Sequence, residues 1–215
     1  MLKIEKTQVT GFEAAVRGAR NPMNSWEKSD SRWIHDGIDE TPVYQIGEAD
    51  RKLLLKLALA GDDHGKFLRM ITVTCDITAP MFWNAELDTY KVGTVRNSCS
   101  KMHKLASKPI TLKDFSLDET AEDEDEMRAF CYLVGSCERL RQKYNNTGDV
   151  RYWRMLIERL PESYNQRYTW QANYAVLRNM YHARKRHKLT EWHDFCKWCE
   201  SLPNSWLITE VKRDD

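Results

Sequence analysis

The segment that most constrains the fold is a β-branched, alternating run over residues 66–78, "KFLRMITVTCDIT". It is bounded by Gly65 and Pro80, and this pattern predicts a core strand. The residues that follow it, "PMFWNAELDTYK" (80–91), have helical spacing of their apolar side chains, with Pro80 at a favourable first helical position. A strand followed directly by a helix indicates a mixed fold rather than an all-helical or all-β one.

The rest of the chain supplies elements of both kinds. Residues 2–9 alternate like a half-buried strand, whereas residues 11–22 and 48–61 have helical patterns. After Thr111, a candidate N-cap, the patterns are almost entirely helical. Helices are predicted at 149–161 with Val150, Trp153, Ile157 and Leu160 on one face, after Pro161 through Trp170, Tyr174, Leu177 and Tyr181, and at 190–203 with Thr190 as N-cap. We therefore expect an α/β (α+β) fold with a mixed sheet and a largely helical C-terminal half.

The domain organisation follows from length and composition. A chain of 215 residues, 41% hydrophobic, can bury a sizeable core, and it contains no visible repeat, linker or boundary. We expect a single domain over residues 1–215. Residues 22–47 are rich in Asn, Ser, Asp, Gly and Trp without a sustained period, and Trp26 and Trp33 indicate an ordered excursion rather than a flexible linker.

Charge and apolar content limit the classes of partner. The 33 basic residues nearly balance the 32 acidic residues, so no nucleic-acid or membrane partner is predicted, and any anion site must be local. No apolar run approaches the ~20 residues of a membrane span, and no secretory signal pattern is present. The expected location is therefore cytoplasmic, where the 6 cysteines would be reduced thiols.

A polar stretch follows the predicted strand and helix, at residues 88–105: "DTYKVGTVRNSCSKMHKL". It contains no large apolar residue between Val95 and Met102. Its hydroxyl, amide and ammonium groups could bind a phosphate. They could equally form a Ser/Asn-rich turn whose side chains cap their own backbone, and the stretch alone leaves both interpretations open.

A basic cluster ends one predicted helix, "RNMYHARKRHK" at residues 178–188. Cations at the end of a helix are favoured by its dipole, which is sufficient to explain most of them. Arg184 differs, because Leu177 and Tyr181 precede it by seven and three residues on the same side of the helix. An inward-facing guanidinium would need an anionic partner.

Motifs for other chemistries are weak. Cys196 and Cys199 form a single CxxC inside a helical pattern, which indicates packed thiols, and no metal site is predicted. The acidic run at 118–126 is typical of a solvated helix start. The sequence lacks the GxGxxG, P-loop, GxSxG and HExxH motifs, so the mechanisms that depend on them are not supported.

Three segments, in order along the chain, resemble the flavin-dependent thymidylate synthase (ThyX) family. "HGKFLRMITVTCDITAP" resembles the family's H-x-x-F-E-H block and core strand, with His64 and Phe67 in place. "VGTVRNSCSKMH" resembles the R-H-R-x-x-S-x-N-E-x-S-x-R-Y signature in Asn97 and Ser100. "YTWQANYAVLRNMYHAR" keeps an Asn followed eleven residues later by an Arg, here Asn173 and Arg184. The resemblance spans roughly residues 48 to 204 and points to a ThyX-like group of bacteria and their phages.

The resemblance implies a nucleotide ligand similar to dUMP and sites shared across a homotetramer. Ser100 and Lys101, with Ser98 and Asn97, would bind the phosphate, and Arg184 would pair with it, from a neighbouring subunit where the site is shared. A full synthase would transfer a methylene group from methylenetetrahydrofolate to dUMP, with FAD as hydride carrier and NADPH as its reductant.

The departures fall mainly on the flavin side. Thr89, Tyr90 and Lys91 replace the family's R-H-R, Leu68 and Arg69 replace Glu-His, Ser98 replaces the signature Glu, and Met102 and His103 replace the final Arg-Tyr. The remaining candidates for cofactor binding are His64, Arg69, Lys91 and Asn173, and no catalytic residue is assigned. Three functions stay open: a nucleotide-modifying methyltransferase, a nucleotide-binding protein that has lost FAD, and a structural or protein-interaction module that uses residues 22–47.

Overall fold

The computed structural model describes residues 1–35 and 42–210, so part of the predicted excursion, residues 36–41, lies outside the described residues. The chain forms two compact units. Unit 1 comprises Met1–Glu5, Asp76–Thr89 and Arg96–Thr169, and unit 2 comprises Lys6–Cys75, Tyr90–Val95 and Trp170–Asp215. Each unit is described by itself below. The single domain over residues 1–215 stays a prediction.

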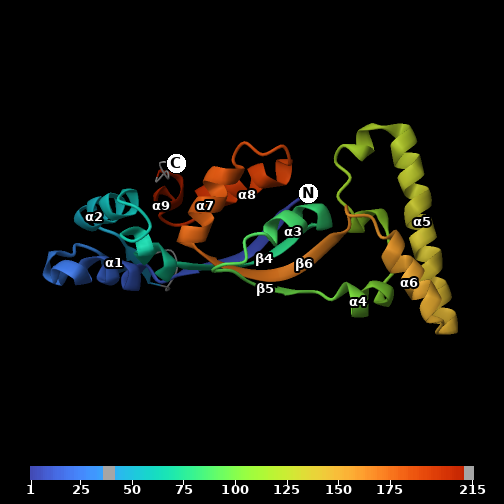
Figure 1. Ribbon diagram of the computed structural model, residues 1–215, viewed down its shortest axis with the longest axis horizontal. Helices are drawn as coiled ribbons and strands as arrows, with labels where there is room; N and C mark the ends of the chain where they lie inside the picture. The colour runs from blue at the N-terminus through green and yellow to red at the C-terminus, as the bar shows by residue number, and fades with distance from the viewer. Residues whose placement is uncertain (36–41, 211–215) are drawn as a thin grey trace. The chain divides into compact units, whose positions relative to one another are not determined.

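A four-stranded sheet has the order β1-β4-β6-β5, and each of its strands contributes residues to both units. Side chains alternate along β4, where Val73, Cys75 and Ile77 are buried and the residues between them are partly exposed. The expected mixed α+β fold class is confirmed (Figure 1). The strands are β1 (Lys3–Thr10), β4 (Thr72–Pro80), β5 (Val95–Ser98) and β6 (Asn165–Asn173).

The strand predicted over residues 66–78 begins later than expected. Residues Gly65–Met70 form a 3-10 helix, η3, and β4 starts only at Thr72. Phe67 and Leu68 are neighbours in sequence and both are buried. Successive side chains of a strand point to opposite faces, whereas a helical turn can direct two neighbours into one core. The prediction was therefore wrong for residues 66–70.

The helix predicted from Pro161 through Tyr181 is wrong in its first half. Residues Asn165–Asn173 form strand β6, in which Tyr168, Trp170 and Ala172 are buried at alternate positions. Only the second half is helical, as α7 (Tyr174–Arg184). The side-chain period of the first half is two rather than 3.6, and its Tyr, Thr and Trp favour strands.

Other helix boundaries also differ from the predictions. α3 (Met81–Leu87) is shorter than 80–91, because Pro80 is the last residue of β4. Thr111 caps only a short 3-10 turn, η5 (Leu112–Asp114), and the long helix α5 (Glu124–Thr147) begins after Asp123, whose carboxylate accepts from two backbone amides. Thr190 is the first residue of α8 (Thr190–Ser201) rather than its cap.

Unit 1 contains a helical layer with its own core. α5 and α6 (Val150–Arg159) run side by side (Figure 1). The buried residue of α6 is Leu156, not the predicted face, since Val150 is 63% exposed. The core of this layer consists of Leu105, Ile110, Phe115, Val134, Cys137, Leu140, Leu156 and Tyr164. Shorter elements of unit 1 are α4 (Lys101–Lys104), η4 (Leu105–Ser107) and η6 (Thr120–Glu122).

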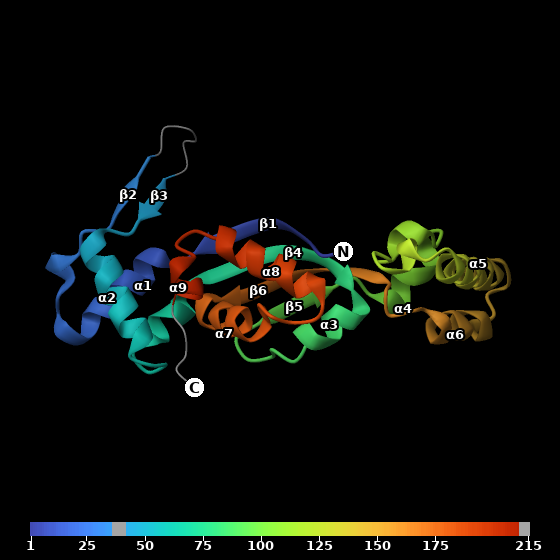
Figure 2. The same ribbon diagram turned by 90° about the horizontal axis from the view of Figure 1, so that it is seen from above.

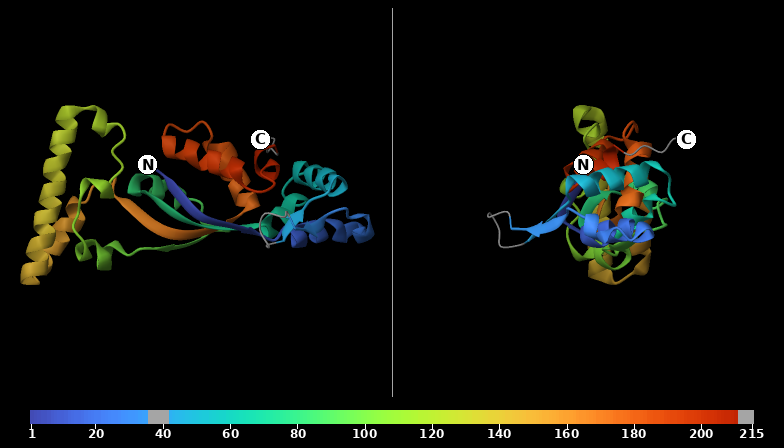
Figure 3. Two further views of the ribbon diagram at one scale, coloured as in Figure 1. Left: turned by 180° about the vertical axis from the view of Figure 1, so that it is seen from behind. Right: turned by 90° about the vertical axis from the view of Figure 1, so that its left-hand side faces the viewer.

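Unit 2 is built from helices at both ends of the sequence. α1, α2 and η3 pack against one another (Figure 3), and α7 contacts α8 and α9. Within the described residues, no helix combines the length and the apolar character needed to cross a membrane. The remaining elements of unit 2 are α1 (Phe12–Arg20), α2 (Glu48–Leu59), α9 (Trp206–Thr209), η1 (Asn21–Met23), η2 (Trp26–Lys28), β2 (Arg32–Ile34) and β3 (Val43–Gln45).

The predicted excursion contains an antiparallel ribbon of β2 and β3, drawn as two arrows beyond α1 and α2 in Figure 2. Its base is held by Asp50, which is fully buried at the start of α2. The Asp50 carboxylate accepts from Arg20 Nε at 2.5 Å and from the hydroxyls of Ser29 and Ser31, each at 2.6 Å. A buried carboxylate with several donors fixes the path of the chain between α1 and the ribbon.

Candidate functional site

A cavity of about 340 Å³ lies in unit 2 at the N-terminus of α7. It combines residues from the end of α2, from η3, from the Tyr90–Val95 segment and from α7. Its lining consists of Asp62, Gly65, Arg69, Val92, Gly93, Asn173, Ala175, Val176, Arg178 and Asn179.

The first turn of α7 presents backbone amides to this cavity. Asn173 is the N-cap, and its side-chain oxygen accepts from Val176 N at 3.1 Å. Ala175 and Val176, which follow it, line the cavity. The first amides of a helix have no partner within the helix and carry the positive end of its dipole, so they favour an anion.

Two arginines add positive charge to the same cavity. Arg178 is only 4% exposed, and its Nη2 donates to Asp62 Oδ1 at 2.9 Å. Arg69 lies at the exposed end of η3. Two guanidinium groups against the single carboxylate of Asp62 leave the lining with a net positive charge. A buried guanidinium held in place by a carboxylate presents its remaining donors in a fixed orientation.

Asn179 contributes a buried polar atom to the lining. Its Oδ1 is fully buried, and it accepts no hydrogen bond from the part of the chain that the structure describes. Buried amide oxygens are usually hydrogen-bonded, and one that faces a cavity can accept from a ligand donor.

Gly93 forms the part of the wall where the Tyr90–Val95 segment approaches α7. Its φ is +77°, in the left-handed region, and an added Cβ would lie 3.1 Å from both Asn173 Nδ2 and Val176 Cγ2. Only glycine combines this backbone conformation with so close an approach. Gly93 therefore sets the separation between the segment and the N-cap of α7.

The structure brings together two of the four residues predicted for cofactor binding, Arg69 and Asn173. His64 lines a different cavity of unit 2, and Lys91 is exposed and lines neither. The sequence did not single out Arg178 and Asn179. Their signal was present, because Arg178 follows Leu177 on the buried side of α7, where a charged residue is unusual.

Arg184, at the last turn of α7, is surrounded by aromatic rings of unit 2. Its Nε donates to the phenol oxygen of Tyr90 at 2.8 Å. Its guanidinium lies 4.9 Å from the ring centre of Trp192 and 5.4 Å from that of Tyr90. The side chain is thus half-buried among cation–π contacts, in line with the expectation that it does not simply project into solvent.

The polar stretch of unit 1 forms strand β5 followed by the single turn α4. Ser100 is the N-cap of α4, and its hydroxyl accepts from His103 N at 3.3 Å. Asn97 and Ser98 are exposed at the end of β5. Self-capping therefore accounts for Ser100, while a phosphate at these residues stays a prediction.

Two cations lie near one another in this part of unit 1. Burial and the nearby Arg96 lower the pKa of Lys101, although Glu162 opposes them. Arg96 stacks over the ring of Tyr168 at 4.1 Å and pairs with Asp88 at 2.5 Å. Arg96 was not among the predicted phosphate-binding residues. Its positive charge near Lys101 would favour an anion beside β5.

The CxxC motif lies inside α8, with both thiols buried. Burial raises the pKa of Cys196 to about 11 and raises that of Cys199 further. Thiols of this kind are protonated and unreactive near neutral pH. Across residues 1–35 and 42–210, no three His, Cys, Asp or Glu side chains are grouped so that they could hold a metal ion.

Comparisons with known proteins place the fold. No family model matches the sequence. No curated protein matches it either. Two solved structures of the flavin-dependent thymidylate synthase ThyX from Helicobacter pylori, both with FAD and dUMP, are similar in structure. One is 19% identical, covers 98% of this chain and 100% of the other with a TM-score of 0.70, and the second is 18% identical, covers 98% and 99%, with a TM-score of 0.69. This chain therefore has a ThyX-like fold over nearly its whole length.

Proposed function

We propose that this protein is a ThyX-like nucleotide-binding protein and that the cavity at the N-terminus of α7 binds the phosphate of its ligand. The observation that carries the proposal is the convergence of Arg69, Arg178 and the first amides of α7 on one cavity. Guanidinium groups and helix N-terminal amides are the donors that phosphate groups require.

The size and the remaining polar groups of the cavity favour a mononucleotide. About 340 Å³ lies near the lower end of the ~300–1,000 Å³ typical of small-molecule sites. Asn179 offers an amide whose oxygen accepts and whose nitrogen donates, which suits the edge of a base. The solved ThyX structures contain dUMP, and a dUMP-like ligand is the first candidate here.

The residues predicted from the sequence belong to the same proposal. Ser100 and Lys101, with Asn97 and Ser98 beside them, would bind a phosphate together with Arg184 in a homotetramer whose subunits share sites. The lowered pKa of Lys101 and the proximity of Arg96 support an anion beside β5. Arg184 would keep its contacts with Tyr90 and Trp192, which fix the plane of its guanidinium.

The residues at the flavin positions do not fit FAD well. Thr89 donates its hydroxyl to Glu86 O at 2.7 Å, and Tyr90 accepts from Arg184. Lys91 is exposed. None of these side chains reproduces a guanidinium held at a flavin, so no hydride step follows from them. A thymidylate synthase that uses FAD, NADPH and methylenetetrahydrofolate is the alternative function, and a non-catalytic nucleotide binder is favoured over it.

Thermal unfolding with added ligands tests the proposal. We expect dUMP to raise the melting temperature, corresponding to ~2.7 kcal/mol at about 100 times its Kd, and uridine, which lacks the phosphate, to have far less effect. Arg69→Gln and Arg184→Ala should each weaken the response to dUMP. Arg154→Gln is the matched control, because Arg154 is 77% exposed and pairs with Glu158 on the surface of unit 1.

Two outcomes would count against nucleotide binding: equal responses to dUMP and uridine, or a dUMP response that Arg69→Gln and Arg184→Ala leave unchanged. The FAD alternative has its own measurement. A purified protein with flavin absorbance, or one whose melting temperature FAD raises, would favour the synthase; a colourless protein without an FAD response would exclude it.

A further inference from the structure

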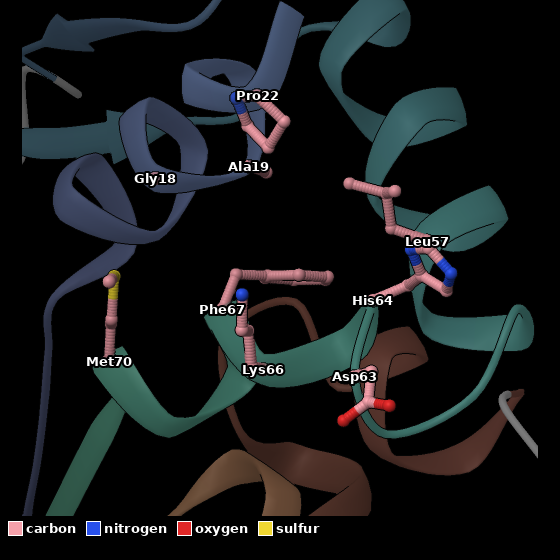
Figure 4. A pocket seen from close by; sticks show the side chains of 9 residues that line it. All are labelled: Gly18, Ala19, Pro22, Leu57, Asp63, His64, Lys66, Phe67 and Met70. Atoms are coloured by element: carbon pink, nitrogen blue, oxygen red, sulfur yellow. The ribbon is translucent and has the colours of Figure 1, made fainter.

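A second cavity of unit 2, of about 170 Å³, lies between α1, α2 and η3 (Figure 4). Gly18, Ala19 and Pro22 form its wall on the side of α1, and Leu57 comes from α2. The side of η3 and the turn before it contribute the remaining lining residues: Asp63, His64, Lys66, Phe67 and Met70.

The wall of this second cavity is mainly apolar. The Phe67 ring extends across the space between η3 and α2 in Figure 4, with Met70 at one end and Leu57 at the other. Phe67 is 2% exposed and Ala19 is 9% exposed, so the inner surface is part of the core. Apolar cavities of about 150 Å³ can hold a benzene ring, and this one is of similar size.

The charged groups at the rim are arranged asymmetrically. In Figure 4 the Lys66 side chain rises beside Phe67 toward α1, whereas the Asp63 carboxylate points away from the space enclosed by Ala19 and Pro22. The imidazole of His64 lies beside Leu57. A ligand in the cavity would therefore meet an ammonium and an imidazole but not the carboxylate, and an anionic group is favoured over a cationic one.

The second cavity is distinct from the one at the N-terminus of α7. No described residue lines both. Successive residues of η3 divide between them: Gly65 and Arg69 face the first cavity, and Lys66, Phe67 and Met70 face the second. The second cavity thus does not need the nucleotide site in order to bind a ligand.

We propose that the cavity between α1, α2 and η3 is a separate binding site for small aromatic or short-chain carboxylates, with the apolar body against Phe67 and the carboxylate beside Lys66. This site also gives His64 a place in binding that differs from the cofactor role expected from the resemblance. The proposal does not depend on the proposed nucleotide function, because none of its residues belongs to the first cavity.

Benzoate is the probe, and benzylamine, with the same ring and the opposite charge, is its control. Binding is followed through the ¹³C-methyl resonance of Met70, assigned with Met70→Leu, and the methyl of Met155 on α6 in unit 1 serves as an internal reference. We expect saturable shifts of the Met70 resonance with benzoate, little change with benzylamine and no change at Met155.

Two variants test the two halves of the site on the intact chain. Leu57→Trp fills the cavity from a partly exposed position and should abolish the Met70 shifts. Lys66→Gln, at an exposed residue that should fold normally, is expected to weaken benzoate about fivefold through loss of one charge pair. Lys52→Gln, on an exposed turn of α2 that does not line the cavity, should leave binding unchanged.

Three results would overturn the proposal: no saturable shift of the Met70 resonance with benzoate, equal binding of benzoate and benzylamine, or benzoate binding that Lys66→Gln does not weaken. The last two remain decisive even if Leu57→Trp does not fold. Benzoate binding can be present when dUMP binding is absent, and the reverse, so the two proposals fail separately.

Discussion

Arg184 and Tyr90 are joined in unit 2 by a hydrogen bond from the guanidinium Nε to the phenol oxygen, 2.8 Å long. Tyr90 stands where the resemblance expects the histidine of R-H-R, and Arg184 stands where it expects a phosphate-binding arginine. A position expected to serve a flavin thus orients a residue expected to serve a nucleotide. This contact is one physical reason why the nucleotide interpretation is stronger here than the flavin one.

Removal of that acceptor should destabilise the protein modestly. Tyr90→Phe keeps the ring that Arg184 stacks on but leaves Nε without this partner, and we expect a loss of about 1 kcal/mol in the free energy of unfolding. Urea denaturation gives the value. Tyr132→Phe is the control, because Tyr132 is 75% exposed, and it should change stability by far less. Equal effects of the two substitutions would contradict a role for the hydrogen bond.

Asp50 should be the most sensitive position of the segment between α1 and the β2–β3 ribbon. Asp50→Asn leaves the buried Arg20 guanidinium without its carboxylate, so we expect a loss of about 3 to 5 kcal/mol in the free energy of unfolding. Chemical denaturation measures it, and Asp194→Asn, in a surface pair with Lys197, is the control. A loss below about 1 kcal/mol would show that the cluster does not hold the ribbon.

Glu138 on α5 should contribute to stability only above acidic pH. Hydrogen bonds from Arg141, Ile110 N and Gln142 outweigh burial and lower the pKa of Glu138 to about 2. A lowered pKa in the folded state gives stability that is complete above the unfolded pKa of about 4.5 and is lost as the pH falls toward 2.

The variant Glu138→Gln makes that contribution measurable. We expect it to be less stable than the unmodified protein by about 1 to 2 kcal/mol at pH 7, and the difference should shrink between pH 4.5 and pH 2. Free energies of unfolding across this range test it, with Glu158→Gln, whose carboxylate is 63% exposed, as control. A difference that does not change with pH would argue against the ion pair as its cause.

Gly93 should tolerate substitution less well than another glycine with a similar backbone. Gly148 has φ +69° with open space around it, whereas Gly93 at φ +77° faces Asn173 and Val176. Gly148→Ala should therefore show backbone strain alone, while Gly93→Ala should lose about 1 kcal/mol more through overpacking. Thermal unfolding compares them, and Gly93→Ala should also weaken the response to dUMP. Equal losses would show that the wall of the cavity can move.

The sequence predicted the elements that local patterns determine. The strand at residues 2–9 and the helices at 11–22, 48–61, 149–161 and 190–203 were recovered as β1, α1, α2, α6 and α8 with small shifts of their ends. It failed at residues 66–70 and 165–173, where helical and strand periods are hard to distinguish over a few apolar residues. There the burial of Phe67, Leu68 and Trp170 by distant parts of the chain decided the conformation.

By itself the sequence determined the mixed fold class, the helix-forming segments and two members of the α7 cavity, Arg69 and Asn173. Only the tertiary structure decided that Arg178, Asn179 and Gly93 join them and that His64 does not. Helical and strand patterns arise from neighbours in sequence, which a sequence displays directly. A cavity depends on the packing of segments more than a hundred residues apart, such as Asp62 against Arg178, and no local pattern encodes that distance.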